Sequence, residues 1–298
     1  MNRKVLISGT SGPIGNELLP SLRQRGFEVT RLTRSAPKSV GEIRWDPLQP
    51  IEPNSLSGFD AVLHLAGESI VGRWNPEKKR AIRDSRVLGT QHLAQALARA
   101  PQPPRVLVSA SAVGYYGDRG EEILREENSP GKGFLPDVCR EWETATQAAS
   151  EAGIRVVHIR IGMVLSPKGG ALEAMLLPFR LGVGGKIGSG QQWWSWIDVR
   201  DLANAFVFAI ENESLHGAVN GVSPNAARNV DFTKTLGSAL SRPTIFPLPA
   251  FAARLLLGGM ADELILASQH IEPARLTAAG FTFHYSDLAA SLRANLWM

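Results

Sequence analysis

Cysteine is almost missing from this 298-residue chain, in which Cys139 is the only one. A single cysteine excludes an internal disulfide and any zinc cluster built on cysteines. The six histidines are scattered along the chain without the spacing of metal ligands, so we expect no metal site.

Long hydrophobic runs are missing as well. The longest apolar stretches, such as "FAARLLLGGM", contain charge and are far shorter than the roughly 18–20 residues that span a bilayer. The N-terminal "MNRKVLISG" has no extended apolar region before a cleavage site. We therefore expect a cytoplasmic protein with no membrane partner.

The chain also lacks a block of one charge. Its 32 lysines and arginines exceed its 28 acidic residues by only four, and they are spread along the sequence. Diffuse charge of this kind is too weak for a nucleic-acid footprint but suits small anionic ligands. We expect a small-molecule substrate and no nucleic-acid partner, and a homodimer is left open.

Alternating strand-like and helix-like segments fill the first half of the chain, which is typical of a parallel sheet covered by helices. The expected strands are 4–8, 28–34, 42–46, 60–67, 105–111 and 154–162, and the expected helices are 14–25, 76–100 and 141–153. The pattern becomes irregular and richer in glycine after about residue 165. We predict an α/β fold with a doubly wound, Rossmann-like parallel sheet and a smaller, mostly helical C-terminal region.

The segment "SGTSGPIG" lies between the first expected strand and the first expected helix. Its three glycines, Gly9, Gly12 and Gly15, have the Gly-x-x-Gly-x-x-Gly spacing of a dinucleotide-binding turn. The first allows the tight turn, the second lets a pyrophosphate approach the backbone, and the third lets the helix pack on the strand. The helix N-terminus then offers N–H groups to the phosphates.

The end of the second expected strand distinguishes between the two nicotinamide dinucleotides. An NAD site normally places an acidic residue there, to bind the ribose 2′-hydroxyl. This chain has Thr33, Arg34 and Ser35 instead. A guanidinium and two hydroxyls suit a 2′-phosphate, which favours NADP over NAD, although an exposed surface arginine would give the same pattern.

The glycine triplet, "DAVLHLAG" and "VLVSAS" together resemble the extended short-chain dehydrogenase/reductase superfamily. More narrowly, "RWNPEKKRAIRDSR" and "GGALEAMLLPFRLGVGGKIGSGQQWWSWIDVRDL" resemble its atypical branch, the epimerase family related to NAD-dependent epimerases and dehydratases. That branch ends in a domain of unknown function, which is similar to residues 243–298 here. The resemblance implies an NADP-binding domain over 1–165, whose sheet later segments can complete, and a smaller substrate region over 166–298.

The glycine turn and the resemblance together define a candidate cofactor site. Arg86 would contact the pyrophosphate or a substrate anion, unless it is part of a helix-surface salt bridge. The candidate cofactor-binding residues are Gly9, Thr10, Ser11, Gly12, Pro13, Ile14, Gly15, Thr33, Arg34, Ser35, Leu65, Ala66, Gly67, Glu68, Arg86, Met163 and Val164.

The expected catalytic pair of the superfamily is missing. Typical members carry Tyr-x-x-x-Lys on the helix after the serine-containing strand, and the lysine lowers the pKa of the tyrosine. Alignment on Glu143 puts Leu135 at the tyrosine position and Cys139 at the lysine position. No tyrosine lies between Gly117 and Tyr285.

The remaining candidates for catalysis lie in "SASAVGYYGD". Ser111 aligns with the hydroxyl that binds the substrate oxygen, and Tyr115 and Tyr116 are either proton donors, pocket walls or packing residues. Asp137, Cys139 and Glu143 are further possible acids.

Other side chains of the second half have two interpretations. Trp193, Trp194 and Trp196 would form a stacking wall for a ring-shaped substrate or would seal an interface, and Arg180 and Lys186 would bind an anion or remain solvated.

Two functions are compatible with this sequence. One is an NADP(H)-dependent oxidoreductase or epimerase that acts on a small, nucleotide-sugar-like substrate. The other is an NADP-binding regulatory or structural protein with little or no turnover.

Overall fold

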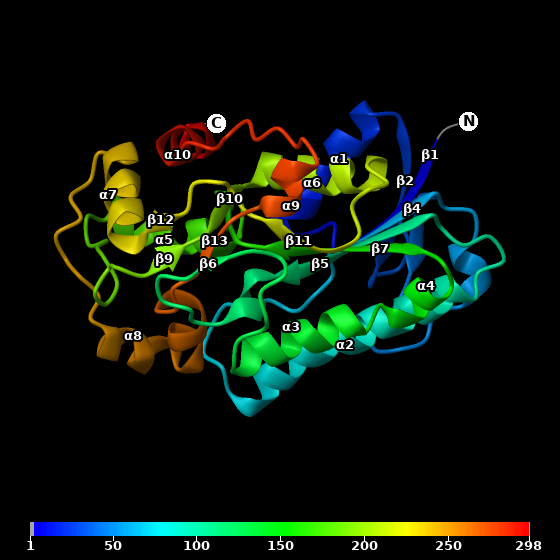
Figure 1. The fold of residues 1–298 in the computed structure, drawn as a ribbon, viewed down its shortest axis with the longest axis horizontal. Helices are drawn as coiled ribbons and strands as arrows, with labels where there is room; N and C mark the ends of the chain where they lie inside the picture. Colours follow the sequence, from blue (N-terminus) through cyan, green and yellow to red (C-terminus); the bar gives the residue numbers. More distant parts are fainter. Residues whose placement is uncertain (1–2, 298) are drawn as a thin grey trace.

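A parallel sheet of seven strands forms the centre of the computed structural model, which describes residues 3–297 (Figure 1). The strands lie in the order β11-β7-β5-β4-β1-β2-β3, and every neighbouring pair is parallel. They are β1 (Arg3–Ser8), β2 (Phe27–Thr33), β3 (Glu42–Arg44), β4 (Ala61–His64), β5 (Val106–Ala112), β7 (Arg155–Ile161) and β11 (Gly217–Gly221). The order reverses between β1 and β4, where sheets of this type bind ligands at the carboxyl ends of the strands. The predicted doubly wound α/β fold is confirmed.

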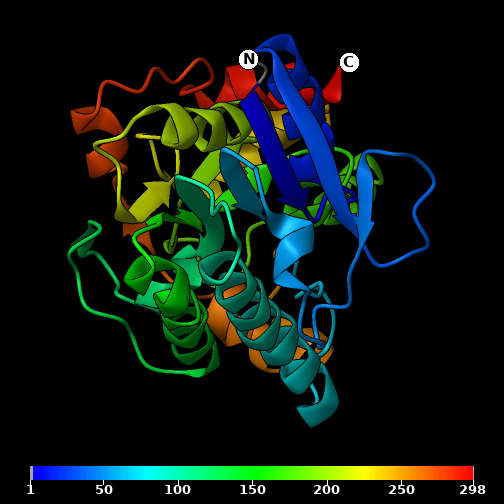
Figure 2. The same ribbon diagram turned by 90° about the vertical axis from the view of Figure 1, so that its right-hand side faces the viewer.

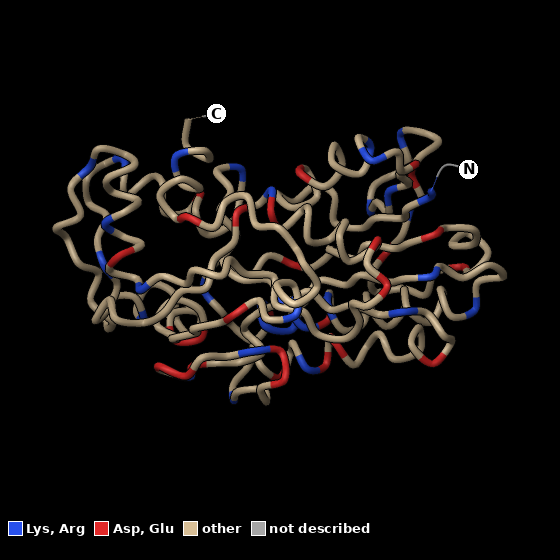
Figure 3. The backbone as a smooth tube through the Cα atoms, turned by 45° about the horizontal axis from the view of Figure 1, so that its top comes forward, with Lys and Arg blue, Asp and Glu red and all other residues tan. Residues whose placement is uncertain are grey.

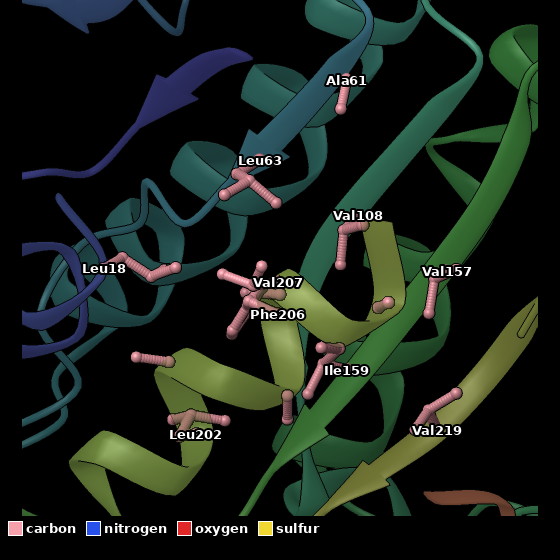
Figure 4. Close-up of a cluster of buried hydrophobic side chains, with 14 of the residues drawn as sticks. Leu18, Ala61, Leu63, Val108, Val157, Ile159, Leu202, Phe206, Val207 and Val219 are labelled. Atoms are coloured by element: carbon pink, nitrogen blue, oxygen red, sulfur yellow. The ribbon is translucent and has the colours of Figure 1, made fainter. Parts of the chain in front are cut away.

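Helices cover both faces of this sheet (Figures 1 and 2). One face carries α1 (Pro13–Gln24) and α6 (Val199–Glu211), and the other carries α2 (Pro76–Ala98), α3 (Phe134–Thr144) and α4 (Gln147–Glu151). Figure 4 shows the core beneath α6, where Phe206 and Val207 meet Leu63, Val108 and Ile159 from three neighbouring strands. All five side chains are fully buried, and each such burial contributes about 1.5–3 kcal/mol.

The second half of the chain adds smaller elements around this sheet. Strand β11 comes from this half and completes the sheet beside β7. The other elements of this half are β8 (Met163–Leu165), α5 (Gly170–Arg180), β9 (Trp193–Trp194), β10 (Trp196–Asp198), β12 (Ala227–Arg228), α7 (Asn229–Ala239), α8 (Ala250–Leu257), β13 (His270–Ile271), α9 (Ala274–Ala278) and α10 (Leu288–Leu296). Strand β6 (Ile123–Leu124), from the first half, pairs with β13.

The helix expected over 141–153 differs most from the structure. It begins earlier, at Phe134, and divides into α3 and α4 at residues 145–146. A contact from far along the chain stabilises the early start, because the carboxylate of Glu263 accepts hydrogen bonds from the backbone N–H groups of Phe134 (3.2 Å) and Leu135 (2.6 Å). The hydroxyl of Thr146 donates to the carbonyl of Glu143 at 2.8 Å, where α3 ends.

Charge and hydropathy have no strong bias along the fold. Basic and acidic residues are intermixed along the tube in Figure 3. Within residues 3–297, no helix is long and apolar enough to cross a membrane.

Candidate functional site

The glycine turn between β1 and α1 has the geometry of a phosphate cradle. Gly9 adopts φ +74°, and a Cβ there would lie 2.6 Å from the backbone of Leu65. A Cβ on Gly15 would lie 2.5 Å from the Cα of Thr10, whereas one on Gly12 would meet only the Gly9 oxygen, at 3.7 Å. Packing therefore requires the first and third glycines, and the second faces open space.

The N-terminus of α1 is left available by its own sequence. Gly12 is the N-cap and has no side chain to bind the first N–H groups, and Pro13 follows at the first helical position. The first turn contains no acidic residue. The helix dipole and the N–H groups of Ile14 and Gly15 can thus act on an anion. Gly169, just before α5, lies against the Pro13 ring, so the segment after β8 borders the same turn.

The turn after β4 is held by a buried hydrogen-bond chain. Ser8 Oγ accepts from the N–H groups of Leu65 (3.1 Å) and Ala66 (3.3 Å), and lies 2.8 Å from His64 Nδ1. The Ser8 hydroxyl therefore donates to Nδ1, and His64 Nε2–H donates to Thr90 Oγ1 at 3.0 Å. Burial lowers the pKa of His64 to about 4, so its ring is neutral at neutral pH.

This chain continues to α3, because Trp142 Nε1 donates to Thr90 Oγ1 at 2.9 Å. It connects β1, β4, α2 and α3 directly below the glycine turn. Sequence reasoning missed it, since His64 was only one of six scattered histidines. The sequence offered one indication of this chain, because Ser8 and His64 are polar residues at the carboxyl ends of the buried strands β1 and β4.

The end of β2 carries the three residues expected to bind a 2′-phosphate. The hydroxyls of Thr33 and Ser35 lie 3.0 Å apart, and Arg34 between them is exposed. The guanidinium of Arg34 lies near enough to Glu68 to help lower the pKa of that carboxyl, after the larger effect of the ion pair between Glu68 and Lys78 at 2.7 Å. The structure therefore brings the ends of β2 and β4 into one electrostatic environment.

Arg86 lies inside the molecule, between the turn after β4 and α3. Its Nη1 donates to the carbonyls of Glu68 (2.9 Å) and Ile82 (3.1 Å). Its Cζ lies 5.1 Å from the centre of the Trp142 ring. A Cβ on Gly67 would lie 3.2 Å from the same Cζ. Burial lowers the pKa of Arg86. It is not the surface salt bridge that the sequence left open, and its guanidinium faces Gly67 at the candidate cofactor site.

The carboxyl end of β5 holds an ion pair. Arg160 on β7 contacts Glu143 on α3 through Nε–Oε1 (2.8 Å) and Nη2–Oε2 (2.9 Å), and Ser111 Oγ donates to Glu143 Oε1 at 2.7 Å. Burial on its own would raise the pKa of Glu143, but the hydrogen bonds and charge of Arg160 lower it overall. The Ser111 hydroxyl is therefore engaged with a carboxylate and presents only acceptor sites elsewhere.

The two tyrosines have different environments. Tyr116 is fully buried, donates to Asn220 Oδ1 at 2.7 Å and accepts from Arg160 Nη1 at 3.0 Å. Burial is the main reason why its pKa is raised to about 12. This placement speaks against Tyr116 as the proton donor. Tyr115 is half-buried, and its ring covers the Arg160 guanidinium, whose Cζ lies 3.5 Å from the ring centre.

Apolar packing surrounds the positions that align with the usual catalytic pair. Leu135 is buried in a cluster with Trp74, Ile82 and Met260. Cys139 is buried, and burial is the main reason why the pKa of its thiol is raised to about 12. Neither side chain is an acid or a base at neutral pH. Asp137, another candidate acid, is exposed and forms an ion pair with Arg140 at 3.1 Å.

The remaining predicted residues lie around this centre. Ser11 is exposed on the glycine turn, and Ile14 packs against the core beneath α1. Met163 and Val164 lie on β8, where they pair with Trp196 and Ile197 of β10.

Two of the three tryptophans after the glycine-rich loop are core residues of the second half of the chain. Trp196 and Trp194 are buried in one apolar cluster with Phe232, whereas Trp193 stacks on His270 with ring centres 4.1 Å apart. Arg180 is exposed at the end of α5. Lys186 is exposed too, and its Nζ donates to the carbonyl of Ser189 at 3.3 Å.

Comparison with protein-family models assigns most of the chain. Residues 5–220 match the NAD dependent epimerase/dehydratase family, and residues 248–294 match a domain of unknown function, DUF1731. An epimerase family protein of Mycobacterium bovis is 41% identical, and the alignment covers 98% of this chain and 97% of the relative. Epimerase family protein SDR39U1 of Homo sapiens is 38% identical, with 97% and 98% covered.

Solved structures give the same assignment. The crystal structure of human epimerase family protein SDR39U1 with NADPH matches with a TM-score of 0.90 at 38% identity, covering 98% of each chain. The nucleoside-diphosphate sugar epimerase from Corynebacterium glutamicum matches with a TM-score of 0.83 at 41% identity, covering 99% of this chain and 58% of that one. The resemblance seen in the sequence is confirmed: the chain belongs to the NAD dependent epimerase/dehydratase family and carries a C-terminal DUF1731 domain.

Proposed function

We propose that this protein binds NADP(H) across the carboxyl ends of β1, β2 and β4. The observation that carries the proposal is the glycine turn, in which Gly9 and Gly15 are required by packing while Gly12 faces open space at an uncapped helix N-terminus. A pyrophosphate is the group that fits such a turn. The related human protein whose structure was solved with NADPH supports the assignment.

The 2′-phosphate would be held by Arg34 with the hydroxyls of Thr33 and Ser35. Residues 33–35 include no carboxylate that could accept a hydrogen bond from a ribose 2′-hydroxyl. Arg86 would contact the pyrophosphate or the neighbouring ribose from the other side of the turn after β4. The remaining proposed contacts come from the glycine turn, from Leu65 to Glu68 and from Met163 and Val164.

We further propose that the protein is an oxidoreductase or epimerase for a small substrate of the nucleotide-sugar type. Bound NADP(H) supplies hydride transfer. Ser111 would bind a substrate oxygen as an acceptor, because its proton is donated to Glu143. Tyr115 is the phenol that remains near this end of β5, and it would form the pocket wall or supply a proton. The nucleoside-diphosphate sugar epimerase from Corynebacterium glutamicum, which is 41% identical, supports a sugar-nucleotide ligand.

A second function is favoured by one specific observation. Leu135 and Cys139 fill the aligned catalytic positions with groups that do not exchange protons at neutral pH. In this alternative, NADP occupancy is a structural or regulatory signal and turnover is weak or absent.

One series of measurements separates these functions. NADPH binding is followed by the change in nucleotide fluorescence, and NADPH oxidation is then followed over a panel of carbonyl compounds and nucleotide sugars. Binding with oxidation of a panel member supports the enzyme, binding without oxidation supports the regulatory protein, and no binding contradicts both. Arg34→Asp is expected to weaken NADPH binding far more than NADH binding, and equal loss would contradict the 2′-phosphate assignment.

We propose the cytoplasm as the compartment of this protein, where a buried free thiol such as that of Cys139 stays reduced. Residues 1–165 would form the cofactor domain, completed by β11, and residues 166–298 the substrate region. A homodimer is compatible with this arrangement.

A further inference from the structure

We infer that Arg44 on β3 is a second guanidinium for the 2′-phosphate of NADP and determines, together with Arg34, the preference over NAD. This inference rests on the proposed cofactor. A 2′-phosphate carries close to two negative charges, and one exposed arginine neutralises only part of them. A second cation at the end of β2 would neutralise the remaining charge of the phosphate.

The register of the sheet places Arg44 beside the proposed phosphate site. β2 and β3 pair in parallel, with Thr33 opposite Arg44 at their carboxyl ends, and Trp45 N–H donates to the Thr33 carbonyl at 2.9 Å. Figure 2 shows these two strands, in blue and lighter blue, at the edge of the sheet. Residues opposite each other in neighbouring strands point to the same face. Arg44 thus emerges next to the Thr33 hydroxyl.

The face is the one on which a phosphate would lie. Leu32 and Ile43, one residue earlier in each strand, pack into the core under α2. Side chains alternate along a strand, so Thr33 and Arg44 point to the opposite face, which carries α1. The N-terminus of α1 is the proposed pyrophosphate site, and the 2′-phosphate therefore approaches from this side.

The charges around Arg44 leave it available for an anion. On the same face, Glu42 is already neutralised by its ion pair with Arg31 and also accepts the Lys38 backbone N–H at 2.6 Å. Asp46, the nearest acid that follows, accepts a hydrogen bond from Leu48 N–H at 2.9 Å within its own turn.

Arg44 itself has no such partner. Among the ion pairs formed within residues 3–297, none includes Arg44 or Arg34, although both are exposed. Two unpaired guanidinium groups and two hydroxyls thus surround the end of β2.

Arg44→Ala tests the inference, with Arg23→Ala as the matched control. Arg23 is an exposed arginine near the far end of α1, and its replacement removes the same charge without touching the end of β2. We expect Arg44→Ala to weaken NADPH binding about five- to tenfold, to leave NADH binding within about twofold, and to reduce the salt dependence of NADPH binding. Arg23→Ala should change neither nucleotide's affinity.

A second probe isolates the phosphate from the rest of the cofactor. Adenosine 2′,5′-bisphosphate and AMP differ in the 2′-phosphate alone, and calorimetry with both should show the Arg44→Ala loss only for the bisphosphate. Equal weakening of both ligands, or of NADPH and NADH, would overturn the inference while leaving the proposed cofactor intact. Unchanged NADPH affinity in Arg44→Ala with a strong loss in Arg34→Asp would overturn it as well. Failure of the wild-type protein to bind NADPH would overturn both proposals.

Discussion

The carboxylate of Glu143 and the guanidinium of Arg160 form a two-point ion pair between α3 and β7, with N–O distances of 2.8 and 2.9 Å. Arg160 also donates to the Tyr116 hydroxyl and to the carbonyl of Glu126. One side chain therefore connects the central sheet, the helix above it and the segment after β5.

Replacing Arg160 with methionine is expected to lower the free energy of unfolding by about 3–5 kcal/mol, because it leaves the Glu143 charge buried without a partner. The double variant Glu143→Gln/Arg160→Met should lose less than Arg160→Met alone. Urea unfolding at pH 7 measures both. A larger loss in the double variant would show that the carboxylate is not what the arginine stabilises.

The lowered pKa of Glu143 also sets a pH dependence. Its stabilising contribution is complete above the ordinary glutamate pKa and is lost as the pH falls through the lower value of the folded state. Glu143→Gln should therefore flatten the acid limb of the unfolding curve below about pH 4.5. An acid limb identical to that of the wild type would contradict this assignment.

His64 should produce a pH effect in a different range. Its pKa is lowered from 6.5 to about 4, so between these values the unfolded chain binds a proton that the folded chain does not. Stability must then fall as the pH falls through this window, by about 3 kcal/mol for the whole shift. His64→Asn should remove most of this slope in urea unfolding between pH 7 and pH 4. His158, whose pKa burial also lowers, accounts for a remainder. His92→Asn is the control.

The three glycines of the turn should respond differently to alanine. Gly9→Ala and Gly15→Ala place a methyl group against backbone and are expected to destabilise the fold by about 1–3 kcal/mol. Gly12→Ala has room for the methyl group, so the melting temperature should stay near that of the wild type while NADPH binding is lost. A Gly12→Ala variant that binds NADPH normally would remove the pyrophosphate from this turn.

Tyr116→Phe should act on stability and not on the cofactor. The change removes one buried hydrogen bond from Asn220 and one from Arg160, at a cost of about 1–3 kcal/mol. NADPH affinity should change by less than twofold. Tyr115→Phe, which removes the hydroxyl of a half-buried ring, is the comparison and should be nearly neutral in stability. A specific loss of nucleotide binding in Tyr116→Phe would contradict the structural role.

The arrangement of the glycine turn and of the end of β2 could be predicted from the sequence because its determinants are local. Gly9, Gly12 and Gly15 follow a strand and begin a helix, and Thr33 to Ser35 end the next strand, so the order of elements alone brings these residues to one edge. The prediction that Leu135 and Cys139 replace the usual catalytic pair also needs no structure, because it depends on residue identity alone.

The remainder depends on contacts between distant segments. No pattern near Tyr116 indicates that Asn220 and Arg160 occupy its hydroxyl, and the pairing of Ser111 with Glu143 joins residues 32 positions apart. The start of α3 at Phe134 depends on a distant contact as well, because the carboxylate that binds the N–H groups of its first turn comes from Glu263. The position of Arg44 beside Thr33 depends on the register between β2 and β3. A single arginine in a three-residue strand gives no pattern from which that register could be predicted.

Glu263 links the C-terminal DUF1731 domain to α3, the helix that carries Leu135 and Cys139. The carboxylate of Glu263 binds the first N–H groups of α3. Docking of the last fifty residues therefore also stabilises the first turn of that helix. Truncation before DUF1731 would therefore cause more than the loss of an appendage: it would unwind the first turn of α3 and uncover the apolar cluster around Leu135. The DUF1731 segment thus packs directly against the helix that follows β5 in the epimerase/dehydratase module.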